Sequence, residues 1–251
     1  MGGLSQRVVG LLALAFACVA PEAHAGFGAP PVVPDPPPEL PMFLGGEAPA
    51  LRYGKLEPSA CEAELTRRAV PFVLVDGARG VLAPVRLTGP LHGVTFHTGL
   101  PKAERATSPW EIVDCRLALA LDDFAAQLSL HDVAQVIHFS VYRPPVTSWP
   151  TGKLASRHPG ALAIDAGSFV KKDGTTLEVE RDFHGHIGAL TCGTGAHPDQ
   201  ATPQAIELRH ILCDAADSRL FNVMLTPDYN RPHRNHFHLE VTAGVKWFVV
   251  H

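Results

Sequence analysis

Two segments of the chain carry apolar residues at the three-to-four-residue spacing of a helix. The first spans residues 116–128, and the second spans 203–216 and opens with a proline at its first turn. We therefore expect two amphipathic helices that pack against a core. Their inward-facing residues are Leu117, Leu121, Phe124 and Leu128 in the first segment, and Leu208, Ile211, Leu212 and Ala215 in the second.

Shorter segments have the pattern of β-strands. In 135–143, Ile137, Phe139 and Val141 alternate with His138, Ser140 and Tyr142. Further strands are expected at 161–170, 221–225, 237–241 and 245–250, and the Gly- and His-rich stretch 182–202 is expected to be a loop. Because strands and helices follow one another without regular alternation, the pattern predicts an α+β fold with a small, mostly antiparallel sheet and flanking helices.

The first 50 residues differ in character from the rest of the chain. Residues 1–25 are typical of a secretory signal peptide, with an apolar run over 8–20 and a cleavage site at Ala23-His24-Ala25. That run is shorter than the roughly 20 residues of a membrane-spanning helix, and we expect no transmembrane segment further along. Cys18 leaves a lipoprotein as an alternative, although the residues before it fit a lipid-attachment box poorly.

Residues 26–50 contain a run of prolines, and we expect them to form either an extended tether or a disordered N-terminus of the mature protein. The folded domain is then expected over residues 51–251. The signal peptide predicts an exported protein of the periplasm or cell envelope, or a secreted one.

Charge and cysteine content fit this location. The formal net charge is −4 and there is no Lys/Arg cluster, so we expect no electrostatic binding of nucleic acid. Without Cys18 the chain has four cysteines, an even number that suggests two disulfides with three possible connectivities. Sequence proximity favours Cys61–Cys115 and Cys192–Cys213. The absence of a CxxC pair argues against a cysteine-based zinc site.

Fourteen histidines are the unusual feature of the composition, and two clusters suggest metal chemistry. His158 lies in turn-like sequence before a strand that carries Asp165, a carboxylate that is costly to bury unless it is paired or bound to a metal. In the second cluster His236 and His238 would point to the same face of a strand. Neither pattern is specific alone. Together they predict a metal site, because imidazole and carboxylate are preferred zinc ligands and three protein ligands leave a position for water.

The runs SRHPGALAID and LTPDYNRPHRNHFHLEV resemble the extensin-like C-terminal domain family of bacteria. Cys61, Cys115 within VDCRLALAL and Arg143 within FSVYRPP extend the resemblance over about residues 61–241. This family is similar in turn to the zinc D-alanyl-D-alanine carboxypeptidases, the penicillin-insensitive murein endopeptidases and the hedgehog signalling domain. The resemblance implies their zinc peptidase fold, with Zn²⁺ as cofactor. The three zinc-ligand positions of that superfamily fall on His158, Asp165 and His238.

The same resemblance implies the catalytic groups. The carboxypeptidases have a glutamate base three residues before the last ligand, where this chain has Asn235. The murein endopeptidases have histidines five and two residues before it, and His233 and His236 reproduce that spacing. We therefore expect His236 to be the general base and His233 its helper or a substrate-binding group, with an exchange of the two roles left open. Arg143 is expected to face the substrate carboxylate or the developing oxyanion, the alternative being an ordinary strand-end arginine.

The loop after the first ligand departs from the family pattern. Ser156 matches a small turn or supporting residue, but Ala161 stands where the family usually has glycine, with Gly160 one place earlier. If that glycine serves a positive-φ turn, the loop must shift by one residue or accept strain. His184 and His186 are expected to face solvent or line the substrate site, without binding a second metal. Structural roles are expected for His92, His97, His131, His138, His197, His210 and His251.

These features together predict a monomeric, exported zinc peptidase that hydrolyses an amide bond in the stem or cross-link peptides of peptidoglycan. The alternative is a non-catalytic, zinc-containing peptidoglycan-binding module, which the missing glutamate favours and the two upstream histidines disfavour. A third interpretation, a metal-scavenging envelope protein, would bind several metal ions per chain. Which peptide bond is cleaved does not follow from the sequence.

Overall fold

The computed structural model describes residues 47–251, so the expected signal peptide and most of the expected tether lie outside the described residues. Helix α1 (Pro49–Tyr53) crosses the expected start of the folded domain and buries Ala50 and Tyr53. Within 47–251, no helix combines the length and the apolar character that crossing a membrane requires.

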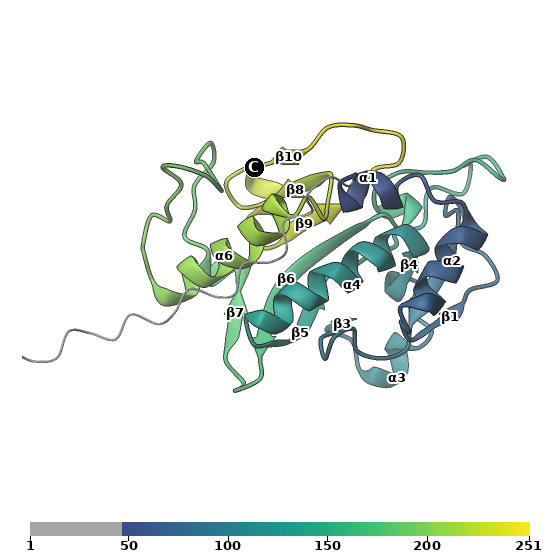
Figure 1. Ribbon diagram of the computed structural model, residues 1–251, viewed down its shortest axis with the longest axis horizontal. Coiled ribbons are helices and arrows are strands. Elements are labelled where there is room, and N and C mark those ends of the chain that lie inside the picture. Colours follow the sequence, from purple (N-terminus) through teal and green to yellow (C-terminus); the bar gives the residue numbers. More distant parts are fainter. Residues whose placement is uncertain (1–46) are drawn as a thin grey trace, which may run out of the picture. The chain divides into compact units, whose positions relative to one another are not determined.

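A mixed seven-stranded sheet forms the centre of the described domain (Figure 1). Its strands lie in the order β10 (Val249–Val250), β8 (Val223–Leu225), β9 (Phe237–Glu240), β6 (Ala163–Lys171), β5 (Val133–His138) and β3 (Thr95–Thr98), and β7 (Thr176–Glu178) pairs with β6. The β10–β8 and β3–β5 pairs are parallel, whereas the other pairs are antiparallel. The prediction of an α+β fold is therefore confirmed, with a mixed sheet.

Helices and a second, smaller sheet complete the domain. The small antiparallel sheet contains β1 (Phe72–Leu74), β2 (Pro84–Leu87) and β4 (Ile112–Asp114). The remaining helices are α2 (Pro58–Arg67), α3 (Lys102–Arg105), α4 (Cys115–Leu130), α5 (Val179–Asp182) and α6 (Pro203–Asp217), with short 3₁₀ turns η1 (Pro109–Glu111), η2 (His158–Gly160) and η3 (Arg231–His233). Figure 1 shows α4 and α6 lying across one face of the main sheet.

Helix α4 lies at the middle of the core. Its N-cap is Asp114, whose side chain accepts a hydrogen bond from the backbone N–H of Arg116 at 3.0 Å. On its buried face, the ring of Phe124 meets Phe169 and Phe221 edge-on, with centroids 6.5 and 5.6 Å away. Both helices expected from the apolar spacing are present, as α4 and α6.

Most of the expected strands are also present, although their ends differ. The segments 161–170, 221–225 and 237–241 form β6, β8 and β9, and the last expected strand is reduced to the two residues of β10. Residues 183–202 contain no helix or strand, which confirms the expected loop. Both expected disulfides are formed: Cys61–Cys115 joins α2 to α4, and Cys192–Cys213 joins this loop to α6.

In the strand expected at 135–143, Val136, His138 and Ser140 are buried, whereas Ile137 and Phe139 lie on the more exposed face. The register of β5 against β6 shifts between Ile137 and His138 because β6 contains one extra residue, Gly167, at this point, and the alternation of side chains along β5 is unbroken. His138 lies near Glu111, with 3.6 Å between His138 Nε2 and Glu111 Oε2, and Phe139 is 50% exposed. The strand also ends at His138 and does not reach Arg143. The ring of Phe139 covers Gly167 and lies against His236, a residue of the histidine cluster described next.

Candidate metal centre

Strand pairing brings two of the expected metal ligands together. In the antiparallel β6–β9 ladder, Asp165 lies directly opposite His238, so both side chains occupy the same face of the sheet. His158, in the η2 turn that precedes β6, reaches the same point from the loop. His158, Asp165 and His238 are 7%, 2% and 7% exposed. One ligand atom of each lies within 4.8 Å of those of the other two.

The three side chains meet through defined atoms. His158 Nε2 and His238 Nδ1 each lie 3.0 Å from Asp165 Oδ1, and the two nitrogens are 3.3 Å apart. A single carboxylate oxygen and two imidazole nitrogens thus face one small volume. The group can hold a metal ion.

The second nitrogen of each imidazole supports this conclusion. His158 Nδ1 lies 2.8 Å from the carbonyl oxygen of Val141, and His238 Nε2 lies 3.2 Å from Glu240 Oε2. Because a carbonyl and a carboxylate only accept hydrogen bonds, each neutral ring carries its proton on that outer nitrogen. The lone pairs of His158 Nε2 and His238 Nδ1 then point towards each other and towards Asp165.

Three converging acceptors repel one another unless a proton or a metal cation lies between them. Protonating both rings would instead place two imidazolium cations in contact inside a buried site, at a large desolvation cost. A divalent ion relieves the repulsion with no added proton, and two neutral imidazoles with one carboxylate form a common donor set for such ions. The residues present therefore fit a bound metal.

Proton affinities at the centre follow from these contacts. Burial alone would raise the pKa of Asp165, but the adjacent imidazoles of His158, His236 and His238, which donate to the carboxylate when they are protonated, outweigh it and hold the pKa well below its usual range. Burial lowers the pKa of His238, and hydrogen bonds with Asp165 and Glu240 more than reverse this, so the pKa is raised. The carboxylate is thus ionised at neutral pH, and a proton competes with a metal for His238.

His236 lies at the edge of the centre. Its Nε2 is 3.2 Å from Asp165 Oδ1, yet His236 is not one of the three residues whose ligand atoms all lie within 4.8 Å of one another. Its Nδ1 lies 2.9 Å from Asn235 Oδ1, and its ring meets Phe139 edge-on with 5.8 Å between centroids. The side chain is thus held on two sides with Nε2 directed at the metal ligands.

His233 lies beside His236 in the η3 turn. Its Nδ1 is 2.6 Å from Asn230 Oδ1, and its ring centroid is 5.2 Å from that of His236 and 5.7 Å from that of His238. Burial first, and then the nearby charges of His236 and His238, lower the pKa of His233 to about 4. At neutral pH this imidazole is therefore uncharged. The ring of Tyr229 packs on its other side, with 5.4 Å between centroids.

Arg143 contacts the centre through Asp165. Its Nη2 donates to Asp165 Oδ2, its Nε donates to Ser140 Oγ at 2.9 Å, and its side chain is 53% exposed. The arginine thus holds the outer carboxylate oxygen while Oδ1 faces the histidines. Arg143 was expected to face the substrate. The structure shows it in contact with Asp165, one of the potential metal ligands, with its side chain partly at the surface.

The loop before β6 resolves the question raised by Ala161. Ala161 itself adopts the left-handed conformation, with φ +53°, which costs a non-glycine residue roughly 1–2 kcal/mol. Gly160 serves a different purpose, because a Cβ there would lie 2.2 Å from the backbone oxygen of Ala155. Ser156 belongs to the same turn, where its carbonyl accepts from the N–H of Gly160 at 3.1 Å. The loop therefore accepts strain at residue 161 and close packing at residue 160.

One residue of the site was not expected from the sequence. Glu240 is buried, and it holds His238 through Oε2 while its Oε1 accepts from Thr242 Oγ1 at 2.8 Å. The alternation of His236, His238 and Glu240 on β9 is the signal that could have found it, since every second residue of a strand shares a face.

Several of the remaining histidines form ordinary polar contacts. His131 Nε2 lies 3.0 Å from Asp214 Oδ2, and His186 Nδ1 lies 2.7 Å from Asp199 Oδ1 at the surface. Within residues 47–251, His184 and His186 belong to no cluster of three potential metal ligands.

The sequence matches the extensin-like protein C-terminus family over residues 80–249. The chain belongs to this family. The match includes every residue of the metal centre, so the centre lies within the extensin-like domain. No curated protein sequence and no solved structure matches the chain.

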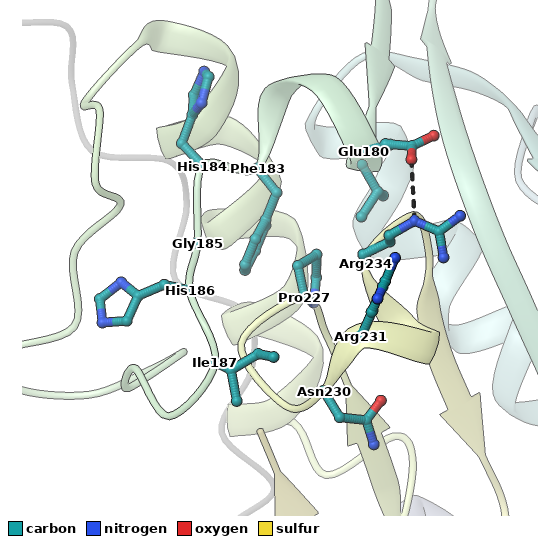
Figure 2. A pocket seen from close by; sticks show the side chains of 11 residues that line it. Glu180, Phe183, His184, Gly185, His186, Ile187, Pro227, Asn230, Arg231 and Arg234 are labelled. Atoms are coloured by element: carbon teal, nitrogen blue, oxygen red, sulfur yellow. Dashed lines mark ion pairs between the residues drawn. The ribbon is translucent and has the colours of Figure 1, made fainter.

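The extensin-like domain also has a surface groove of about 470 Å³ next to the centre (Figure 2). One side of the groove is the loop that carries His184 and His186, and the other is the turn from Asn230 to Arg234. Asn230 links the groove to the metal centre, because it lines the groove and accepts the hydrogen bond from His233. His184 and His186 are therefore groove-lining residues; His186 is exposed, as expected, and His184 is partly buried.

Proposed function

We propose that this extensin-like protein is an exported, zinc-dependent peptidase that hydrolyses an amide bond in peptidoglycan stem or cross-link peptides. The observation that carries the proposal is the convergence of His158 Nε2, His238 Nδ1 and Asp165 Oδ1, with each imidazole held through its outer nitrogen. Two imidazoles and one carboxylate leave a coordination position for water or substrate, which is the usual arrangement of a catalytic zinc site. When bound, zinc would polarise a substrate carbonyl and lower the pKa of water towards about 7.

In this proposal His236 is the general base. Asn235 Oδ1 only accepts a hydrogen bond, so the proton of the neutral His236 ring is on Nδ1 and the lone pair of Nε2 faces the centre. Nε2 accepts a proton from the attacking water and returns it to the leaving amine. The pKa of about 4 makes His233 a weak proton acceptor, so it is assigned to hydrogen bonding with the substrate or with His236.

Arg143 and the aromatic neighbours complete the assignment. The half-exposed guanidinium of Arg143 supplies positive charge beside Asp165, where charge develops on the carbonyl oxygen of the substrate. Phe139 packs against His236 and Tyr229 packs against His233, which restricts both imidazoles. These contacts hold the general base and its neighbouring imidazole in place before substrate binds.

Two further arguments support peptidoglycan as the substrate. The motifs around the three ligands resemble those of zinc carboxypeptidases and murein endopeptidases, enzymes of the cell wall. Two disulfides within residues 47–251 are typical of proteins from oxidising compartments, where the wall is found. A non-catalytic wall-binding module is the second candidate, and the observation in its favour is Asn235 at the position of the carboxypeptidase glutamate.

The test combines metal analysis with digestion of purified peptidoglycan followed by mass spectrometry. We expect one zinc per chain in the parent protein and in His236→Ala, and a loss of zinc in His238→Ala. New muropeptides should appear only with the parent and with the control His210→Ala, which alters an exposed histidine of α6.

The outcomes separate the two candidates. One zinc per chain without cleavage of peptidoglycan from several sources would favour the binding module. Full activity of His236→Ala would show that His236 is not the base. Several metal ions per chain would instead favour a scavenging role.

A further inference from the structure

The groove beside the metal centre has a positively charged side. Arg231 and Arg234 come from the turn around η3 and extend along the same side, with Glu180 facing Arg234 (Figure 2). Phe183 and Pro227 supply apolar surface between this side and the loop of His184 and His186. We call this feature the arginine groove; its defining residues are Glu180, Phe183, His186, Pro227, Arg231 and Arg234.

The charges of the arginine groove are only partly compensated. Glu180 Oε1 lies 3.4 Å from Arg234 Nε, but the two side chains are 63% and 58% exposed, so water and salt screen the pair strongly. Arg231 forms no ion pair with any of residues 47–251. An incoming carboxylate can therefore bind Arg231 directly and compete with Glu180 for Arg234. The groove is cationic in a chain whose formal net charge is −4.

The arginine groove is connected to the metal centre through one side chain. Asn230 lines the groove and holds His233 at 2.6 Å, and the ring of His233 is 5.7 Å from that of His238. Arg231 and His233 belong to the same 3₁₀ turn. An extended peptide with its reacting bond at the metal centre can thus place a neighbouring residue in the groove.

The loop side of the groove is fixed before any ligand binds. A Cβ on Gly185 would lie 2.1 Å from Oδ1 of the buried Asp228, so the loop packs directly on this carboxylate. Asp228 in turn accepts from Arg209 at 3.2 Å, and the disulfide Cys192–Cys213 ties the loop to α6. A preformed wall reduces the ordering cost of binding.

We propose that the arginine groove is a subsite for a free carboxylate of the substrate peptide, bound by Arg231 and Arg234. Guanidinium groups bind carboxylates through paired, charge-assisted hydrogen bonds, which gives the site its preference for an acidic residue over its amide. The inference rests on the proposed function for the position of the reacting bond. The recognition of the carboxylate rests on the groove alone.

The experiment compares two synthetic pentapeptides that differ only in one side chain, a free carboxylate in one and its amide in the other. Binding to the zinc-loaded full chain carrying His236→Ala is measured by calorimetry, so that turnover does not interfere. We expect the acidic peptide to bind about tenfold more tightly than the amide. This preference should decrease as the ionic strength rises.

Three variants in the same background locate the preference. The double variant Arg231→Gln/Arg234→Gln should bring the ratio of the two dissociation constants close to one. Glu180→Gln should increase the ratio, because it removes the carboxylate that competes for Arg234. The control Arg67→Gln alters an exposed arginine of α2, outside the groove, and should keep the parent ratio.

Each result decides for or against the subsite. Equal binding of the two peptides by the parent, or a preference that survives the double variant, would overturn the inference. If the parent cleaves no peptidoglycan but the arginine-dependent preference is present, the subsite stands and the peptidase proposal fails. If the parent cleaves amidated and acidic walls equally, and the double variant cleaves both as the parent does, the subsite fails and the peptidase stands.

Discussion

Replacing Glu240 by Gln tests the argument that fixes the proton on His238. The buried carboxylate of Glu240 accepts from His238 Nε2 at 3.2 Å through one oxygen and from Thr242 Oγ1 at 2.8 Å through the other. Glutamine has the same length, and its amide can still offer an oxygen to His238 and an NH₂ to the Thr242 hydroxyl. The substitution therefore removes the charge and preserves the shape.

The size of the effect follows from that charge. A hydrogen bond to a charged group contributes about 1.5–3 kcal/mol, against about 1 kcal/mol for a neutral one, so the loss is about 1–2 kcal/mol. This corresponds to a metal affinity about 5- to 30-fold weaker. Changes in groups that support metal-binding histidines commonly reduce affinity by about 10- to 100-fold, a range that overlaps this one.

The assay is a zinc titration in competition with a chromophoric chelator. Glu178→Gln serves as the matched control, because it removes a half-exposed carboxylate of β7. Thermal unfolding without metal checks that both variants fold. If Glu240→Gln binds zinc within about twofold of the control, the carboxylate does not act on His238, and the assigned tautomer loses its support.

Three further predictions concern pH, the loop before β6 and the second disulfide. Metal affinity should fall as the pH decreases from about 8 to 5, because His238, with its raised pKa, must lose a proton to bind; a flat profile in chelator competition would contradict this. Gly160→Ala should lower the free energy of unfolding by about 1–3 kcal/mol and weaken metal binding, since its Cβ would lie 2.2 Å from a backbone oxygen. Gly99→Ala, where a Cβ meets nothing within 4 Å, should stay within about 0.5 kcal/mol of the parent in thermal denaturation, and equal losses would refute the packing argument. Removing the Cys192–Cys213 bridge, with 21 residues of separation, by alanine at both positions should cost about 3 kcal/mol in urea unfolding with metal content retained; an unchanged midpoint would refute it.

Elements with a strong local pattern were predictable from the sequence. Helices α4 and α6 follow from the spacing of their buried leucines, and β6 and β9 follow from runs of apolar residues around Asp165 and His238. The short strands β1 to β4 and β7 were not predicted. They are three or four residues long, too short for a periodic signal, and their pairing partners lie elsewhere in the chain.

The end of β5 shows why local alternation does not reveal which face is buried. Alternation is present, but the buried face carries His138 and Ser140, and the apolar ring of Phe139 lies on the more exposed face beside the bulge that Gly167 forms in β6. Gly167 makes the result possible, because a Cβ there would lie 3.0 Å from the Phe139 ring, which instead covers that glycine. Such a contact between neighbouring strands has no signature in either strand alone.

The residues of the site that belong to a sequence motif were predictable, and the contacts that arise only from the tertiary structure were not. Motif positions indicated His158, Asp165 and His238, and the structure brings these three together. The contact of Arg143 with Asp165 Oδ2 joins segments 22 residues apart and was not predicted, while the substrate role that the family resemblance implies for this arginine stays a prediction. Glu240 was missed because a carboxylate at a strand end is ordinary until the strand face is known.

The pairing of Asp165 with His238 links the metal centre to the alignment of the sheet. These residues are 73 positions apart and become neighbours only when β6 and β9 pair in the observed register. A slip of one residue would turn one of the two side chains to the opposite face of the sheet and separate the ligands. A bound ion would therefore stabilise the observed pairing of β6 and β9 relative to every misaligned pairing. The metal content of a refolded sample would then measure the fraction of molecules whose two strands are correctly aligned.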